Sequence, residues 1–174
     1  TYDDLFDINA SIRRDGSSRF GANNKWGYFP SFAMGLKITE FDFMKNVPQI
    51  NFLKIRYGWG KLGNEEVGDY RTFTSISYGF NYPTGLGNPL TLYNGGAPVS
   101  LKNEDLKWES VVMSNIGLDV NLFQNMVSVN LDLYKKTTTD MLVEAPIPTL
   151  TGAQTPPLQN KGSVENKGIE LNIN

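Results

Sequence analysis

The chain has 174 residues, with 16 Lys and Arg against 18 Asp and Glu and no His, so its formal net charge is −2 at pH 7. This balance excludes a strongly basic nucleic-acid binder. Cysteine is absent, which excludes disulfides, thiol nucleophiles and thiolate metal sites. Without His there is neither a Ser-His-Asp triad nor an HExxH zinc site. We therefore expect no enzyme, no metal and no cofactor.

The residue types favour an all-β protein. Aromatic residues make up 12% of the chain, and Gly occurs 17 times. Tyr, Phe, Val, Ile and Thr between Gly- and Asn-rich turns are typical of strands. No apolar run approaches the ~18 residues that a transmembrane helix needs. The first residues, TYDDLFDI, contain neither the basic region nor the apolar region that make up a signal peptide, so we expect no signal peptide in this chain.

Six segments alternate apolar and polar residues with the period of two that a β-strand has. In chain order, the apolar series are Ile8, Ala10 and Ile12; Phe32, Met34, Leu36 and Ile38; Leu53, Ile55, Tyr57 and Trp59; Val112, Ile116, Leu118 and Val120; Val127, Val129, Leu131 and Leu133; and Ile169, Leu171 and Ile173. Between the second and third series, Glu40–Asn51 breaks the alternation and is predicted to hold a short helical turn before Pro48.

The residues between the apolar positions are polar and carry charges of both signs. The set expected to face a lumen consists of Arg13, Lys54, Arg56, Asn115, Asp119, Asn130, Asp132 and Glu170. Two architectures explain a period of two. A soluble β-sandwich buries its apolar face, whereas a membrane barrel turns that face to lipid and its polar face to a lumen.

The connections distinguish the two architectures. The longer ones are Asp15–Asn24, Lys61–Lys107 and Thr137–Gly162, and in an up-and-down sheet all three lie at one end. The shorter connections, among them Leu122–Asn125, lie at the other end. Outer-membrane barrels have this asymmetry, with long extracellular loops and short periplasmic turns.

Aromatic residues bracket the aliphatic positions in a way that also favours the barrel. The upper belt is predicted from Trp26, Tyr28, Tyr57, Trp59 and Trp108, and the lower belt from Phe41, Phe43 and Phe123. Such belts are typical of the two membrane interfaces. Six strands are fewer than the ~8 that close the smallest membrane barrel, so we expect a segment of a longer protein.

Two further motifs are weak evidence for a binding site. Gly58–Gly63 matches G-x-G-x-x-G, but Asn64–Tyr70 reads as a loop where a dinucleotide site needs a helix. We interpret these glycines as a strand tip and turn. The carboxylates Glu65, Glu66 and Asp69 are the ligand type that Ca²⁺ prefers, but a solvated loop explains them more simply.

The longest connection is rich in aromatic residues among Gly and Asn. They are Tyr70, Phe73, Tyr78, Phe80, Tyr82 and Tyr93. Exposed rings beside amide groups suit the capture of sugars or peptides, by stacking and hydrogen bonding. The alternative is that the rings pack the loop onto itself. We predict contact with a substrate or a lid.

Several blocks together resemble the SusC/RagA family of TonB-linked outer-membrane transporters. They are Ala10–Glu40, Phe43–Val47, Leu53–Tyr70, Leu106–Ser110, Asn115–Leu142 and Asn160–Asn174. This resemblance covers nearly the whole chain, in order. It implies that residues 1–174 are a partial C-terminal segment, of about six strands, of an antiparallel up-and-down transmembrane β-barrel of about 22 strands. The plug domain and signal peptide are expected to be absent from this chain.

The resemblance also implies a function and partners. The family imports oligosaccharides or peptides through the outer membrane of Gram-negative bacteria, with substrate bound by extracellular loops and the lumen. Expected partners are a SusD-like surface lipoprotein, the TonB complex through a segment not in this chain, and outer-membrane lipid, with no nucleic acid. The alternatives are a soluble cell-surface β-sandwich recognition module and, with less support, a β-rich glycosidase.

Overall fold

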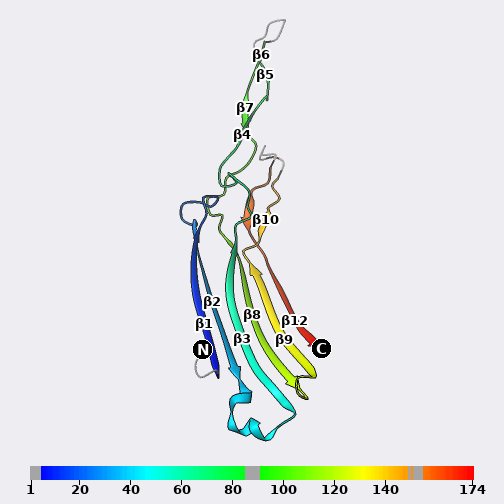
Figure 1. Cartoon of the computed structure of the whole chain (residues 1–174). Coiled ribbons are helices and arrows are strands. Elements are labelled where there is room, and N and C mark those ends of the chain that lie inside the picture. Colours follow the sequence, from blue (N-terminus) through cyan, green and yellow to red (C-terminus); the bar gives the residue numbers. More distant parts are fainter. Residues whose placement is uncertain (1–4, 85–90, 149, 151–154) are drawn as a thin grey trace.

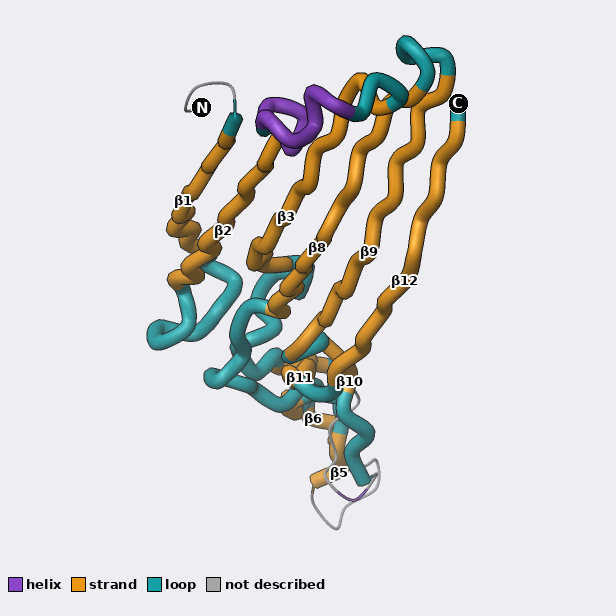
Figure 2. Tube along the Cα trace, turned by 90° about the horizontal axis from the view of Figure 1, so that it is seen from below, coloured by secondary structure: helices purple, strands orange, loops and turns teal. Residues whose placement is uncertain are grey.

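Six long strands form one antiparallel sheet in the computed structural model, which describes residues 5–84, 91–148, 150 and 155–174. The strand order is β1-β2-β3-β8-β9-β12, so each strand pairs with the long strand next to it along the chain (Figure 1 and Figure 2). The bounds are β1 Phe6–Gly16, β2 Trp26–Lys37, β3 Ile50–Asn64, β8 Glu109–Leu122, β9 Val127–Thr139 and β12 Ser163–Ile173. The all-β meander predicted from the period of two is confirmed.

The short connections lie together at one end of the sheet. Two 3₁₀-helices, η1 Ile38–Glu40 and η2 Asp42–Asn46, join β2 to β3 and confirm the predicted helical turn. The turn between β8 and β9 has positive φ angles at Phe123, Gln124 and Asn125. The backbone N–H of Gln124 donates to Asn51 Oδ1 at 2.7 Å, which helps to hold this left-handed turn.

The long connections lie at the other end and contain short strands. β4 Ile76–Tyr78 pairs with β7 Gly96–Pro98, and β5 Tyr82–Thr84 pairs with β6 Thr91–Tyr93. These two ladders form a hairpin that projects beyond the sheet (Figure 1). β10 Leu142–Glu144 pairs with β11 Leu158–Asn160. The sequence analysis treated these connections as loops and missed the short strands. Each of them has only three residues, which is too few to show an alternating pattern.

The register places apolar and polar residues on opposite faces of the sheet. Directly paired residues point to the same side, and one row of partners is Ile8, Met34, Tyr57, Ile116, Leu133 and Ile169. The next row is Asp7, Gly35, Arg56, Gly117, Asp132 and Glu170. We call these sides the aliphatic face and the ionic face.

The aliphatic face is exposed. Ile8 is 56%, Ile116 51% and Ile169 72% accessible. In a β-sandwich these side chains would be buried against a second sheet, so the soluble-sandwich alternative is wrong for this chain. No helix within the described residues is long and apolar enough to cross a membrane.

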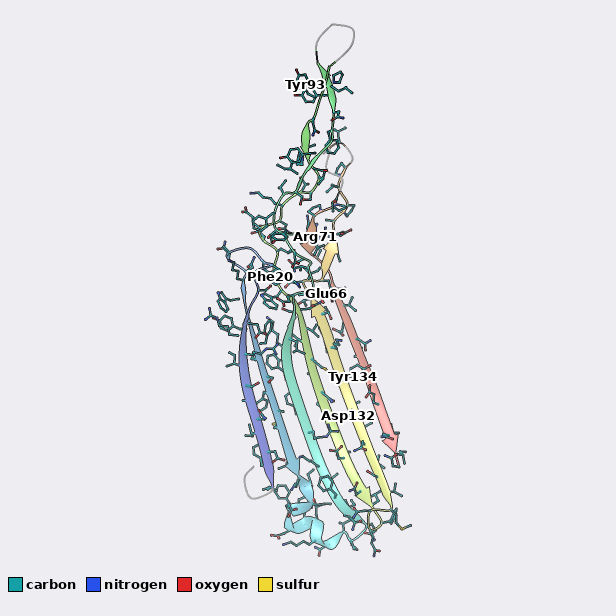
Figure 3. All side chains as sticks on the ribbon, turned by 45° about the horizontal axis from the view of Figure 1, so that its top comes forward. Phe20, Glu66, Arg71, Tyr93, Asp132 and Tyr134 are labelled. Carbon is teal, nitrogen blue, oxygen red and sulfur yellow. The ribbon has the colours of Figure 1, made fainter. Side chains whose placement is uncertain are left out.

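The buried core lies among the long connections instead of on the sheet. Phe20, Val67, Leu106 and Leu158 form it, with Trp108 and Leu142 packed against them. We call these six residues the loop core, and Figure 3 labels Phe20 at this level. Trp108 was predicted in the aromatic belt. That prediction is wrong, because Trp108 packs on Phe20 and Phe29, with ring centroids 5.1 and 5.4 Å away.

Candidate functional site

Ion pairs on the ionic face link three of the long strands. Arg56 on β3 donates to Asp119 on β8 through Nε at 2.6 Å and Nη2 at 2.9 Å, and Nη2 reaches both oxygens of Asp132 on β9 at 3.2 Å. Asn130 donates to Asp119 at 2.9 Å, and Asn115 donates to Asp132 at 3.1 Å. Each carboxylate therefore accepts from a cation and from an amide, as a partly buried charge requires.

Glycines in the strands make these long reaches possible. Gly117 pairs with Arg56 on one side and with Asp132 on the other. A Cβ at Gly117 would lie 2.7 Å from both Arg56 Cζ and Asp132 Oδ1. Gly35 has the same role between β1 and β3, because a Cβ there would lie 2.6 Å from Lys54 Cε, whose Nζ donates to Asp7 at 3.0 Å.

A third glycine accommodates an aromatic ring. Gly168 on β12 pairs with Tyr134 on β9, and a Cβ at Gly168 would lie 2.7 Å from the Tyr134 hydroxyl oxygen. Tyr134 and Asp132 both lie on β9, below the loops (Figure 3). Sequence reasoning missed these three glycines, although glycine inside a strand signals a close approach of another group.

The predicted polar set divides into two groups. Lys54, Arg56, Asn115, Asp119, Asn130 and Asp132 belong to the ionic network, which also includes Asp7, a residue that the sequence analysis did not single out. Arg13 lies nearer the loops, where it pairs with Asp15 at 2.8 Å. Glu170 is the direct cross-strand neighbour of Asp132. All eight lie on the ionic face by register, and their exposure to a lumen stays a prediction.

A shallow hollow of about 470 Å³ lies over this network. Its lining includes Asp7, Lys54, Arg56, Gly58 and Asn115. Asn115 Oδ1 is buried and accepts no hydrogen bond from the described residues. The hollow thus offers charges of both signs to whatever lies against this face, while the acceptor capacity of the buried Asn115 Oδ1 stays unused.

Polar contacts fasten the long connections to one another around the loop core. Arg19 pairs with Asp69 at 3.0 Å, and Asn24 donates to the Asp105 carbonyl at 3.1 Å. Asn103 donates to the Leu158 carbonyl at 2.7 Å. The connections after β1, β3 and β9 therefore form one assembly. Within the described residues no group of three or more acidic, His or Cys side chains could hold a metal ion.

Two exposed ion pairs affect carboxyl groups outside the strands. At the loop end, the hydrogen bond from Lys102, together with its charge, lowers the pKa of the Glu104 carboxyl. At the turn end, the hydrogen bond from Lys45 lowers the pKa of Asp42 in the same way. All four groups are open to solvent, so these pairs contribute little to stability.

The aromatic residues of the longest connection are exposed. Tyr70 is 78%, Phe73 62% and Tyr78 75% accessible, while Phe80 is 41%, and Tyr82 and Tyr93 are 52% accessible. Tyr82 and Tyr93 stack across β5 and β6 with centroids 6.3 Å apart. Figure 3 labels Tyr93 far out on the hairpin, whereas Arg71 lies near its base. Contact of these rings with a substrate or lid stays a prediction.

Comparison with known proteins adds the family to this geometry. Residues 1–174 match the family described as TonB dependent receptor-like, beta-barrel. The chain belongs to this family. Among TonB-dependent receptors, P39 of Formosa agariphila is 45% identical over 172 residues, which cover 99% of this chain and 16% of that protein. SusC of Bacteroides thetaiotaomicron is 39% identical over 168 residues, covering 94% of this chain and 16% of that receptor.

Comparison with solved structures gives the same fold. The RagAB peptide importer in its open-open state matches with a TM-score of 0.84 and 32% identity, over 99% of this chain and 18% of that chain. With the SusC match, this places the segment in the SusC/RagA group. The siderophore receptor PirA of Pseudomonas aeruginosa, at 17% identity and a TM-score of 0.59, shares the fold. The chain spans only 16% of the curated receptors that it matches.

Proposed function

We propose that this segment is part of the barrel wall of a TonB-dependent importer in the outer membrane of a Gram-negative bacterium. The observation that carries the proposal is a sheet with an exposed aliphatic face, an ionic opposite face and long connections at one end only. A membrane barrel needs this combination, because its outer side contacts lipid and its inner side contacts water or protein.

The ionic face lines the lumen in this proposal. Ion pairs between neighbouring strands hold the wall in one register, and the hollow over Arg56 and Asn115 faces the protein's own plug or the passing substrate. The segment performs no covalent chemistry. Energy from the TonB complex reaches the transporter through another part of the full-length protein.

The hairpin of β4, β5, β6 and β7 receives the substrate or a SusD-like lid. Exposed tyrosines suit this role because a rigid ring gains contact area at low cost in conformational entropy. The substrate class is an oligosaccharide or a peptide. The similarity to the RagAB peptide importer supports a peptide, and the SusC/RagA family, which imports oligosaccharides or peptides, leaves both classes in the proposal.

The test uses the full-length transporter in its own membrane. Tyr78→Ala, Tyr82→Ala and Tyr93→Ala are combined, and uptake is measured with labelled oligosaccharide and peptide pools, alongside co-purification of the lid lipoprotein. We expect uptake of one pool, or lid retention, to fall severalfold at an unchanged surface level. The matched control is Phe41→Ala with Phe43→Ala, a stacked pair 5.8 Å apart at the turn end. Unchanged uptake and lid retention in the triple variant would refute the hairpin's role.

A further inference from the structure

Two lysines face each other directly on the aliphatic face. Lys135 on β9 and Lys167 on β12 are register partners, and the same row continues through Ser114 on β8. Like charges in directly opposed positions repel each other. The two lysines border the aliphatic rows of this face on the side of the loops, so their location requires an explanation.

Glu165 offsets only part of this charge. It pairs with Lys135 at 2.9 Å and lies nearer the loops along β12. Lys167 makes no ion pair within the described part of the chain. The Lys135 side chain is 55% accessible despite its pair, and Lys167 is exposed. The cluster therefore keeps a net positive charge, with an exposed Lys167 ammonium beside a Lys135 ammonium that stays half accessible in its pair with Glu165.

The row below the lysines is aliphatic. Ile116, Leu133 and Ile169 are partners in that row, adjoining Lys135 and Lys167 on the side away from the loops. A hollow of about 560 Å³ is lined by these three residues, both lysines and Tyr57. It thus has an apolar floor beneath a cationic rim, which matches a ligand with an acyl chain and an anionic head.

Further basic residues follow the edge of the aliphatic band across the sheet. Lys61 lies two residues beyond Trp59 on β3, and the Arg14 guanidinium on β1 lies over the Trp26 and Tyr28 rings at 4.1 and 5.5 Å. On the aliphatic face, the apolar residues extend nearer to the loops on β1, as far as Ile12, than on β9 and β12, where they stop at Leu133 and Ile169. Strands tilted by about 40° produce this oblique edge, because a membrane boundary crosses tilted strands at different residues.

We propose that Lys135 and Lys167 bind the phosphate of a membrane lipid in the leaflet nearest the long loops, with an acyl chain against Ile116, Leu133 and Ile169. The inference rests on the proposed function, because it requires the aliphatic face to contact lipid. Basic side chains at this depth attract anionic headgroups, and their own stems cover apolar surface. The lipid thereby relieves the repulsion between the two lysines.

The experiment uses the full-length transporter purified in detergent. Its melting temperature is followed as diphosphorylated lipid A is titrated in, and bound lipid is counted by native mass spectrometry. The parallel probes are the dephosphorylated lipid with the same acyl chains and inorganic phosphate alone. We expect the diphosphorylated lipid alone to stabilise the protein at micromolar amounts.

The deciding variant is Lys135→Gln with Lys167→Gln, for which we expect an affinity loss on the order of tenfold. Lys135→Arg with Lys167→Arg should keep binding. Lys136→Gln is the matched control, because Lys136 neighbours Lys135 on β9 but pairs with Met113 and Asn166 on the opposite face. An equal response in the Gln double variant overturns the site, and so does an equal loss with Lys136→Gln.

The remaining outcomes separate the inference from the proposed function. Equal stabilisation by the dephosphorylated lipid shows that the lysines do not select the phosphate, which overturns the inference. Stabilisation by inorganic phosphate alone overturns the lipid as ligand. A full-length protein that stays monodisperse without detergent overturns the membrane barrel itself, and the inference falls with it.

Discussion

Arg56 and Asp132 form an ion pair although a complete strand lies between them. Their nearest atoms are 3.2 Å apart, with β3 on one side, β9 on the other and β8 between. The strand between them contributes Gly117 at the crossing point, so no side chain separates the charges. Three strands are thereby held by a contact that pairing between adjacent strands alone does not provide.

Gly117→Ala tests this relationship. The added methyl group displaces the flexible end of Arg56, which keeps Asp119 and loses Asp132. We expect the free energy of unfolding of the full-length protein, from urea titration in lipid bilayers, to fall by ~1–2 kcal/mol. Gly58→Ala is the control on the same face, since a Cβ there meets nothing within 4 Å. Its change should stay within about 0.5 kcal/mol. Equal effects of the two substitutions would contradict the crossing-point role.

Leu106→Ala tests the loop core. Leu106 is fully buried, at 0% accessibility, so its truncation leaves a cavity among three connections. We expect local stability to fall by ~2–4 kcal/mol. Limited proteolysis of intact cells should then cleave the loops faster, while heat-modifiable mobility of the barrel stays normal. Leu92→Ala, at a position 65% accessible, should leave the proteolysis rate unchanged.

The two faces are tested by a pair of neighbouring substitutions on β12. Leu171 lies on the aliphatic face beside Leu131, and Asn172 lies on the ionic face beside Asn130. Leu171→Lys places a charge toward lipid, and we expect a loss of ~2–4 kcal/mol with reduced assembly of the full-length protein. Asn172→Lys should assemble normally, because its side chain points the other way. The measurement is the amount of folded protein in purified outer membranes. Reversed results would mean that the faces are exchanged.

Topology is tested by labelling a single introduced cysteine in full-length protein from which any other cysteine has been removed by substitution. Leu92→Cys lies on the exposed hairpin, and Lys45→Cys lies in η2 at the opposite end. A membrane-impermeant maleimide should label position 92 on intact cells. Position 45 should react only after the outer membrane is permeabilised. If only position 45 were labelled on intact cells, the orientation would be the opposite of the proposed one, and the hairpin would not lie on the side where substrate arrives.

Much of the sheet could be predicted from the sequence because its two faces contact different surroundings. Each long strand alternates with a period of two, and this determines which residues share a face. The ends of the strands were harder to predict. β3 continues to Asn64 through the glycines that we interpreted as a tip, and β9 continues to Thr139. Since Gly58–Gly63 lies within β3, the dinucleotide interpretation is excluded.

The site was less accessible to sequence reasoning. The charged residues of the ionic face were predicted, but their partners depend on the register between strands far apart along the chain. Nothing near Arg56 in the sequence indicates Asp132. The loop core was missed for the same reason, since Phe20, Val67, Leu106 and Leu158 lie far apart along the chain, in three different connections. Their burial is a property of the assembled loops.

The loop core has a mechanical consequence. The hairpin carrying Tyr93 is long and narrow (Figure 3). Across its base the Ser75 amide donates to Ser100 Oγ at 2.9 Å. Val67 and Leu106, which lie before and after the hairpin along the chain, are buried in the loop core. Phe20 and Leu158 belong to the same buried cluster, so the base of the hairpin is joined to the connections after β1 and β9. We therefore expect a force on the hairpin to move these three connections together, because the loop core joins them.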